Sequence, residues 1–290
     1  MDQLVNWITD NKIPVGPWAK SFITWIQTSF GFFFDFVSEK IGAGMDASVE
    51  LLNNVPPLVF IVVFAGLAYW RQRDWKIPLI VVIGFLFILN QNLWDEMIAT
   101  LLLVLYSTLV SLAIGIPLGI LCARRPWLYN TVAPVLDMMQ TLPSFVYLVP
   151  ALFLFGLGMV PGVVATVIFA VAAPVRLTYL GITQVPTALV EAGESFGCTK
   201  WQLLTRVKLP AAMPSIMAGV TQTIMLSLSM VVIAGLVGAP GLGSPVVRAL
   251  ASANVSLGFE SGLAIVALAI ILDRAMKQPT PRRRLAKKPA

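Results

Sequence analysis

Residues 191–210 read EAGESFGCTKWQLLTRVKLP and form the most informative stretch of this sequence. They are the only substantial polar stretch between the third hydrophobic segment and the last. They carry charges of both signs and are interrupted by a glycine. The flanking segments are apolar enough to cross a membrane, so this stretch reads as a short, structured loop on one membrane face. Such a loop is typical of a contact with another protein.

Local signals divide this loop into two short helices, which we expect at residues 187–197 and 200–208. Thr199 precedes Gln202 by three positions, which is the spacing of a capping box at the start of the second helix. Gly197 lies between the two helices, where glycine permits the positive φ that a tight turn often needs.

The first of these helices combines small residues with apolar ones. Small residues let another protein approach the helix backbone, and apolar side chains offer surface to bury. The small residues are Ala192, Gly193 and Gly197, and the apolar ones are Leu189, Val190 and Phe196. Local features leave two alternatives open: the helix docks into another protein, or the loop packs against its own bundle.

The composition is that of a polytopic membrane protein. The chain is 58% hydrophobic and only 12% charged, with a mean hydropathy of +0.84. A soluble domain would carry about 25% charged residues. The absence of histidine removes the commonest general base and metal ligand, so we expect no catalytic and no metal site. Two cysteines far apart do not imply a disulfide framework.

Hydrophobic stretches predict an all-α fold, a polytopic helical bundle of about seven spans. A spanning helix needs about 20 mostly apolar residues. The stretches that qualify, with soft boundaries, are residues 57–71, 77–93, 97–122, 129–155, 158–181, 211–238 and 257–275.

The charges of the connecting loops predict the orientation. Lysine and arginine gather in loops 71–76, 124–125 and 182–210 and in the C-terminal tail. The alternate loops carry acids, no charge, or only Arg248. Because basic loops stay in the cytoplasm, we expect the N-terminus outside and the C-terminus in the cytoplasm.

Three sequence regions follow from this pattern. Residues 1–56 form an external or interfacial N-terminal segment, in which the aromatic-rich stretch 17–42 predicts an amphipathic interfacial helix rather than an eighth span. Asp2 and Asp10 leave no apolar core for a secretory signal. Residues 57–276 form the transmembrane domain, and residues 277–290 form a basic cytoplasmic tail suited to anionic lipid.

The spacing within the polar loop resembles the EAA motif of bacterial ABC importer permeases. That motif is Glu-Ala-Ala, three residues, Gly, nine residues, Ile, any residue and Leu-Pro. Here Glu191-Ala192-Gly193 is followed by Gly197 and then by Val207-Lys208-Leu209-Pro210. Gly193 and Val207 depart from the pattern, and both changes stay small or apolar.

Further segments resemble the glycine betaine/proline subfamily and extend the resemblance over about residues 95–275. The chain is thus similar to the permease subunit of ProU-type importers for glycine betaine, proline betaine, choline or carnitine. The segments are Leu136–Leu148, Pro214–Val220, Met225–Ala234 and Ala269–Arg274.

The resemblance implies a type I ABC importer permease in the bacterial cytoplasmic (inner) membrane, without an ATPase site. The sequence has no GxxxxGK[ST] motif, so we expect no cofactor in this chain, with ATP and magnesium bound by partner ATPases. The implied partners are a second copy of the permease, two cytoplasmic ATPase subunits, an external binding protein and membrane lipid, with no nucleic acid. The implied ATPase-coupling residues are Glu191, Ala192, Gly193, Gly197, Val207, Leu209 and Pro210.

Ionisable and polar residues inside the spans are the remaining candidates. Asp137 lies within the fourth predicted span, and Arg176 of the fifth is placed to pair with it. We favour an ion pair between two helices over a substrate contact, because a lone buried acid does not suit a zwitterion. The candidate residues of the translocation path are Gln140, Thr141, Phe145 and Tyr147.

The alternative from another class is a stand-alone secondary transporter or channel for a small polar solute. Such a protein would not need loop 187–210 and would more often show internal repeats, none of which we find. An intramembrane enzyme is disfavoured, because no nucleophile and base stand at a recognisable spacing.

Overall fold

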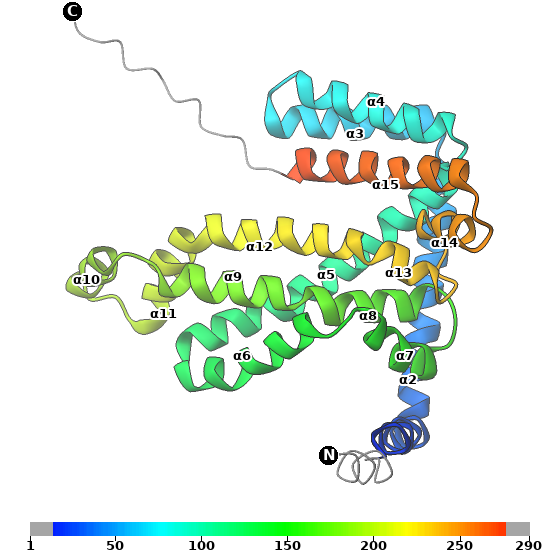
Figure 1. The fold of residues 1–290 in the computed structure, drawn as a ribbon. Coiled ribbons are helices and arrows are strands. Elements are labelled where there is room, and N and C mark those ends of the chain that lie inside the picture. The colour runs from blue at the N-terminus through cyan, green and yellow to red at the C-terminus, as the bar shows by residue number, and fades with distance from the viewer. Residues whose placement is uncertain (1–13, 277–290) are drawn as a thin grey trace, which may run out of the picture.

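The structure is a computed structural model that describes residues 14–276, and its regular elements in that range are helices. They lie in two main layers, with one long helix across an end of the bundle (Figure 1). In chain order they are α2 (Val15–Asn53), α3 (Pro57–Gln72), α4 (Lys76–Asn90), α5 (Trp94–Arg124), α6 (Pro126–Thr141), α7 (Phe145–Phe155), α8 (Met159–Ala170), α9 (Ala172–Thr183), α10 (Thr187–Ser195), α11 (Lys200–Gln202), the π-helix η1 (Leu203–Lys208), α12 (Leu209–Ser229), α13 (Val231–Gly235), α14 (Gly243–Ala251) and α15 (Val255–Met276).

The helices confirm an all-α membrane protein. Four helical segments are long and apolar enough to cross a membrane, or up to six if each strongly bent pair is one span. The four are Trp94–Arg124, Met159–Thr183, Lys200–Gly235 and Val255–Met276. The total of seven spans and the orientation of the termini stay predictions.

The fourth predicted span, residues 129–155, is not one straight helix. The structure divides it into α6 and α7, which are bent by 97° at the break. Leu142 takes an extended conformation with ψ 137°, as expected for the residue before a proline, and Pro143 follows it. A proline in this place both removes a helical donor and turns the chain away from the preceding helix.

Helices α5, α9 and α12 pack closely because glycines let their backbones approach. A Cβ atom built on Gly119 of α5 would lie 2.7 Å from the carbonyl oxygen of Val175 in α9. A Cβ atom on Gly181 of α9 would lie 3.2 Å from the carbonyl oxygen of Ala212 in α12. Such small-residue contacts are the usual basis of helix association in membranes, where no hydrophobic force drives it.

Helices α3 and α4 form a hairpin beside α15, away from the α5–α9–α12 core (Figure 1). Aromatic rings join the hairpin to the start of α5, with centroids 5.6 Å apart for Phe60 and Trp94 and 6.0 Å apart for Phe85 and Trp94. The two helices have 16 and 15 residues, about 24 Å and about 22 Å long. They are shorter than the hydrocarbon core of about 30 Å.

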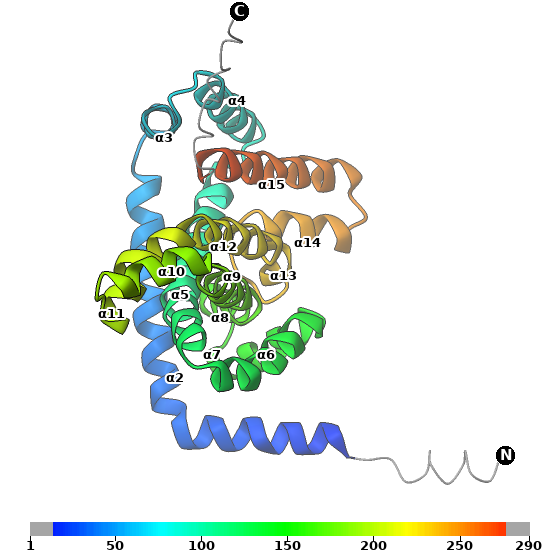
Figure 2. The same cartoon turned by 90° about the vertical axis from the view of Figure 1, so that its left-hand side faces the viewer.

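The aromatic N-terminal segment forms α2, which is longer than the predicted 17–42. It changes direction at Phe30 and lies across the end of the bundle opposite to α10 (Figures 1 and 2). Side chains of α2 reach the end of α7, where Gln27 Nε2 donates to the carbonyl of Phe153 and Ser38 Oγ donates to that of Phe155. These bonds satisfy carbonyls that a helix end leaves free. Residues 1–13 and the predicted basic tail 277–290 lie outside the described residues.

Candidate functional site

The polar loop lies at the end of the bundle opposite to α2 (Figure 1). Its first helix is α10 (Thr187–Ser195), in agreement with the predicted 187–197. The second predicted helix, 200–208, comprises α11 and η1 and does not end at residue 208. It runs into α12 and α13, so that Lys200–Gly235 is one helical segment of 36 residues.

The turn between α10 and α11 has the cap signals that the sequence predicts. Gly197 has φ +76° and donates its N–H to the carbonyl of Glu194 at 2.9 Å, while Cys198 N–H donates to the carbonyl of Gly193 at 3.1 Å. This pair of bonds is a Schellman motif, which needs a left-handed residue at the Gly197 position. Thr199 and Gln202 form the capping box. Both local predictions are therefore confirmed.

Helix α10 packs against η1 through the third position of the EAA-like motif. Gly193 is buried, and a Cβ atom there would lie 2.7 Å from Leu203 Cδ1 and 3.3 Å from Val207 Cγ2. Motif positions 193 and 207 therefore lie against each other, which explains why the first is small and the second is apolar.

Other residues of α10 and its C-cap are exposed. Glu191, Ala192 and Phe196 are exposed, and Phe196 is 89% exposed. The packed edge agrees with the alternative in which the loop packs against its own bundle. Docking into another protein stays a prediction, and the exposed residues include the apolar side chain and the carboxylate that such docking would use.

The predicted coupling residues Leu209 and Pro210 lie within continuous helix. The N–H of Leu209 donates to the carbonyl of Leu204, five residues back, which is the π-helical pattern of η1. Pro210 lacks an N–H and cannot donate to the carbonyl of Arg206 as an α-helix requires. Short π-helical segments of this kind occur often at functional sites.

The loop also contacts the end of α5. The guanidinium of Arg124 lies 5.9 Å from the ring centroid of Trp201, a distance that allows a cation–π interaction. Two cavities, of about 360 Å³ and about 350 Å³, lie where the loop meets the ends of α5 and α9. Glu191 and Lys208 line the first, and Lys208 also lines the second together with Glu194.

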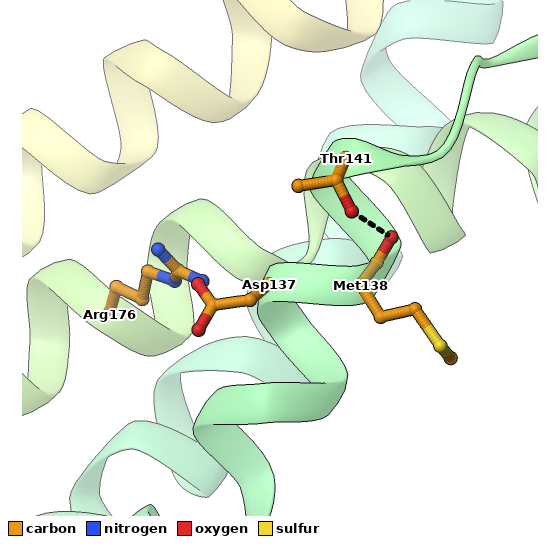
Figure 3. Close-up of polar contacts among 4 residues, drawn as sticks. All are labelled: Asp137, Met138, Thr141 and Arg176. Atoms are coloured by element: carbon orange, nitrogen blue, oxygen red, sulfur yellow. Dashed lines mark hydrogen bonds and ion pairs between the residues drawn. The ribbon is translucent and has the colours of Figure 1, made fainter.

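The structure brings Asp137 of α6 and Arg176 of α9 together (Figure 3). Arg176 Nη2 donates to Asp137 Oδ1, and the two side chains are 35% and 64% exposed. The rings of Tyr129 and Tyr179 stack nearby between the same two helices. Side-chain contacts of this kind attach α6 to α9.

The four candidate path residues do not share one environment. Gln140, Thr141 and Phe145 are exposed, and Thr141 Oγ1 donates to the carbonyl of Met138 at 3.1 Å (Figure 3). Tyr147 is buried, and its hydroxyl donates to the carbonyl of Met139 across the bend. The Tyr147 hydroxyl is therefore occupied in joining α7 to α6.

Sequence reasoning missed polar and methionine side chains on α12. Met217, Thr221, Gln222 and Met225 line a cavity of about 490 Å³ with Met276 of α15. Their helical spacing is visible in the sequence, where all but Met276 fall on one face. Within residues 14–276 no group of acids or cysteines is placed to hold a metal ion.

Comparison with known proteins places the chain in a family. The family model described as binding-protein-dependent transport system inner membrane component matches residues 115–284. The glycine betaine transport system permease protein OpuAB of Bacillus subtilis (strain 168) is 47% identical over 263 residues, covering 91% of this chain and 93% of the relative.

Two further relatives agree. The glycine betaine/carnitine transport permease protein GbuB of Listeria monocytogenes serotype 1/2a (strain 10403S) is 48% identical over 90% of this chain and 94% of its own. The glycine betaine/proline betaine transport system permease protein ProW of Escherichia coli (strain K12) is 45% identical over 90% of this chain and 74% of its own.

A solved structure supports the same fold. An inward-facing conformation of the MetNI methionine ABC transporter aligns with a TM-score of 0.59 and 25% identity, covering 63% of this chain and 92% of that chain. The match of the family model over more than half of the sequence, with these relatives over nine-tenths of it, shows that the chain belongs to the binding-protein-dependent transport system inner membrane components.

Proposed function

We propose that the chain forms the membrane path of an ATP-driven importer for quaternary-ammonium compatible solutes, such as glycine betaine, proline betaine, choline or carnitine. The observation that carries this proposal is the identity of 45–48% to permeases named for glycine betaine, carnitine and proline betaine. Glycine betaine, proline betaine and carnitine share a methylated ammonium and a carboxylate, so one path of zero net charge suits all three.

The proposed assembly contains two copies of this chain, two cytoplasmic ATPase subunits and an external binding protein. ATP and magnesium would be held by the ATPases, because this sequence has no phosphate-binding GxxxxGK[ST] motif. The exposed face of α10, with Glu191, Ala192 and Phe196, fits a groove on the ATPase surface.

Coupling would run from α10 to α12 through contacts described above. A displacement of α10 presses Gly193 against Leu203 and Val207 of η1. Because η1 continues into α12 without a loop, the displacement reaches the bundle as a movement of one helical segment. Closure of the ATPase dimer would in this way move the spans between inward-open and outward-open arrangements.

The paired charges of Asp137 and Arg176 suit such a path. An ion pair contributes no net charge, so it neither traps nor excludes a zwitterion. Among the candidate path residues, exposed Phe145 offers an aromatic face to the ammonium group, and exposed Gln140 and Thr141 offer polar atoms.

The test is ATP-dependent uptake by the complete importer in proteoliposomes. Ala192→Trp puts a bulky group on the exposed face of α10, and we expect it to abolish both uptake and substrate-stimulated ATP hydrolysis. Gly66→Trp on α3 is the matched control, because a Cβ atom added there meets nothing within 4 Å and the position is exposed. If the Ala192→Trp importer transports and hydrolyses ATP as the control does, the coupling role of α10 is wrong.

The alternative is tested by the chain alone. A stand-alone secondary transporter or channel would move betaine in proteoliposomes without ATPase subunits. Uptake of that kind would overturn the importer proposal.

A further inference from the structure

Helix α12 has two faces of different character. One face packs into the bundle and carries small residues and hydroxyls, among them Gly219, Thr223 and Ser227. The other face is exposed at Ala218 and Gln222. This second face is mostly apolar, but it carries the amide of Gln222 at a position where a purely lipid-facing helix would have an apolar side chain.

Gln222 lies midway between Leu209 and Gly235, at the centre of the apolar part of this span. Its side chain is exposed, and within residues 14–276 its amide has no hydrogen-bond partner. An amide without a hydrogen-bond partner is strongly disfavoured in hydrocarbon. Polar side chains at this depth therefore face the interior of an assembly or a water-filled path rather than lipid.

The space beside Gln222 is a cavity of about 490 Å³ between α12 and the end of α15. This volume lies within the usual range for small-molecule sites, about 300–1,000 Å³. The side chains that matter are Met217, Thr221, Gln222 and Met225 of α12 and Met276 of α15. None of the described residues that line the cavity is an acid, a lysine or an arginine.

The position of the cavity suits a passage for solute along α12. Helix α15 ends on the side of the bundle where α10 lies, and Met276 is its last residue (Figure 1). The cavity therefore extends from the depth of Gln222 towards the end that carries the proposed ATPase contact.

The lining suits a methylated ammonium joined to a carboxylate. Three thioethers and their methyl groups form a soft, polarisable surface for the methyl groups of the cation. Gln222 Nε2 supplies two donors for a carboxylate. Thr221 Oγ1 donates to the carbonyl of Met217 at 3.2 Å, so it offers only its lone pairs. A site with few hydrogen bonds and no fixed charge binds weakly, as release requires.

We infer that the cavity beside Gln222 is a transit site for the zwitterionic solute, in which Gln222 contacts the carboxylate and Met217, Met225 and Met276 contact the methylated ammonium. This inference rests on the proposed importer function and adds the residues that meet the substrate within the membrane.

The first experiment asks whether water and solute reach position 222. The complete importer carrying Gln222→Cys is treated in proteoliposomes with a methanethiosulfonate reagent that bears a trimethylammonium group. Adducts are located by peptide mass spectrometry, with the wild-type chain as baseline because it carries Cys122 and Cys198. Ile270→Cys on the exposed apolar face of α15 is the matched control.

We expect the introduced thiol at 222 to be modified, and glycine betaine supplied with its binding protein during ATP turnover to slow that modification several-fold. The thiol at 270 should stay unmodified, because a charged reagent does not enter hydrocarbon. If the thiol at 222 stays unmodified, or instead forms a disulfide between two permease copies, position 222 lies in a helix contact that water does not reach. Either result would overturn the inference.

The second experiment removes the proposed hydrogen bond without changing volume. Gln222→Leu should lower uptake about tenfold, as expected for one lost hydrogen bond to a charged group, and Gln222→Asn should restore part of it. Solute affinity of the separate binding protein should not change. If the wild-type importer transports betaine and Gln222→Leu transports equally well, the transit site is wrong while the proposed function stands. If the wild-type importer transports no betaine, the proposed function itself is wrong.

Discussion

The α5–α9–α12 core and the bent pair α6–α7 are held in opposite ways. In the core, glycines bring backbone against backbone, as at Gly119 and Val175. The bent pair is held by side chains, including the Asp137–Arg176 ion pair and the bond from Gln27 to the end of α7. Backbone contacts cannot adjust without rebuilding the helices, whereas side-chain contacts can break and form again.

This difference suggests a division of roles during transport. We expect the core to move as one body and the bent pair to move relative to it. The exposed polar residues of α6 lie on the bent pair, and the cavity beside α12 lies on the core. Four substitutions test whether the core and the bent pair differ in this way.

Gly119→Leu should have the largest effect. A Cβ atom at 119 already meets a backbone carbonyl at 2.7 Å, so α5 and α9 must separate. We expect a loss of about 3 kcal/mol and little folded protein. Thermal unfolding in detergent measures this, with Gly66→Leu as control because a Cβ atom added at 66 meets nothing within 4 Å. Equal stability of the two variants would show that the core is not packed through backbone contacts.

Asp137→Ala should have an intermediate effect. It leaves Arg176 without its carboxylate in the bundle, and we expect a cost of roughly 1–2 kcal/mol because both side chains are partly exposed. Asp137→Ala combined with Arg176→Ala should recover part of this cost. A double-mutant cycle of unfolding free energies checks the coupling, and strictly additive effects would show that the pair does not hold α6 to α9.

Tyr147→Phe removes the hydroxyl that bonds the carbonyl of Met139 across the bend. We expect a loss of about 1 kcal/mol with the fold intact, since the ring stays buried. Thermal unfolding measures the loss, and Tyr106→Phe, which removes a hydroxyl from the contact between α5 and α2, is a comparison outside the bend. Unchanged stability at 147 would mean that the bend does not depend on this bond.

Gly193→Ala should have the smallest effect, although its Cβ would lie 2.7 Å from another atom. That atom is the far end of the flexible Leu203 side chain, which can move. The gain in helix propensity, about 1 kcal/mol, offsets the adjustment, so unfolding and ATP-coupled uptake should stay close to wild type. Gly197→Ala is the contrast, because φ +76° should cost it about 1 kcal/mol. If Gly193→Ala lost as much stability as Gly119→Leu, a contact to a flexible side chain would be as costly as a contact to backbone, and this distinction would be wrong.

The sequence predicted the two helices and the caps of the polar loop 187–210 well, because the determinants of these features are local. Thr199 and Gln202 lie three residues apart, and Gly197 caps the helix that ends just before it. These interactions form within a few residues, so their spacing is enough to predict them. The continuity of η1 with α12 was not predicted, since Pro210 reads equally well as the start of a new helix.

The sequence predicted one span over residues 129–155, and the structure bends it. Pro143 signals a break, but the 97° angle depends on what α7 packs against, including α2 from the other end of the sequence. Tyr147 was a candidate path residue because an aromatic in a span can face a solute. Its burial and its bond to Met139 depend on the bend itself.

The sequence by itself determined the membrane-spanning helical fold and the two-helix loop with its EAA-like spacing. It also marked Asp137 and Arg176 as intramembrane charges. Hydropathy, capping and charge act over one helix or one turn and are therefore readable along the chain. Only the tertiary structure decided three features. These are which glycines lie at the close helix contacts of the core, the 97° bend between α6 and α7, and the cavity that Gln222 shares with three methionines. These features depend on which helices distant in sequence meet, and the spacing of residues along one helix does not say which other helix packs against it.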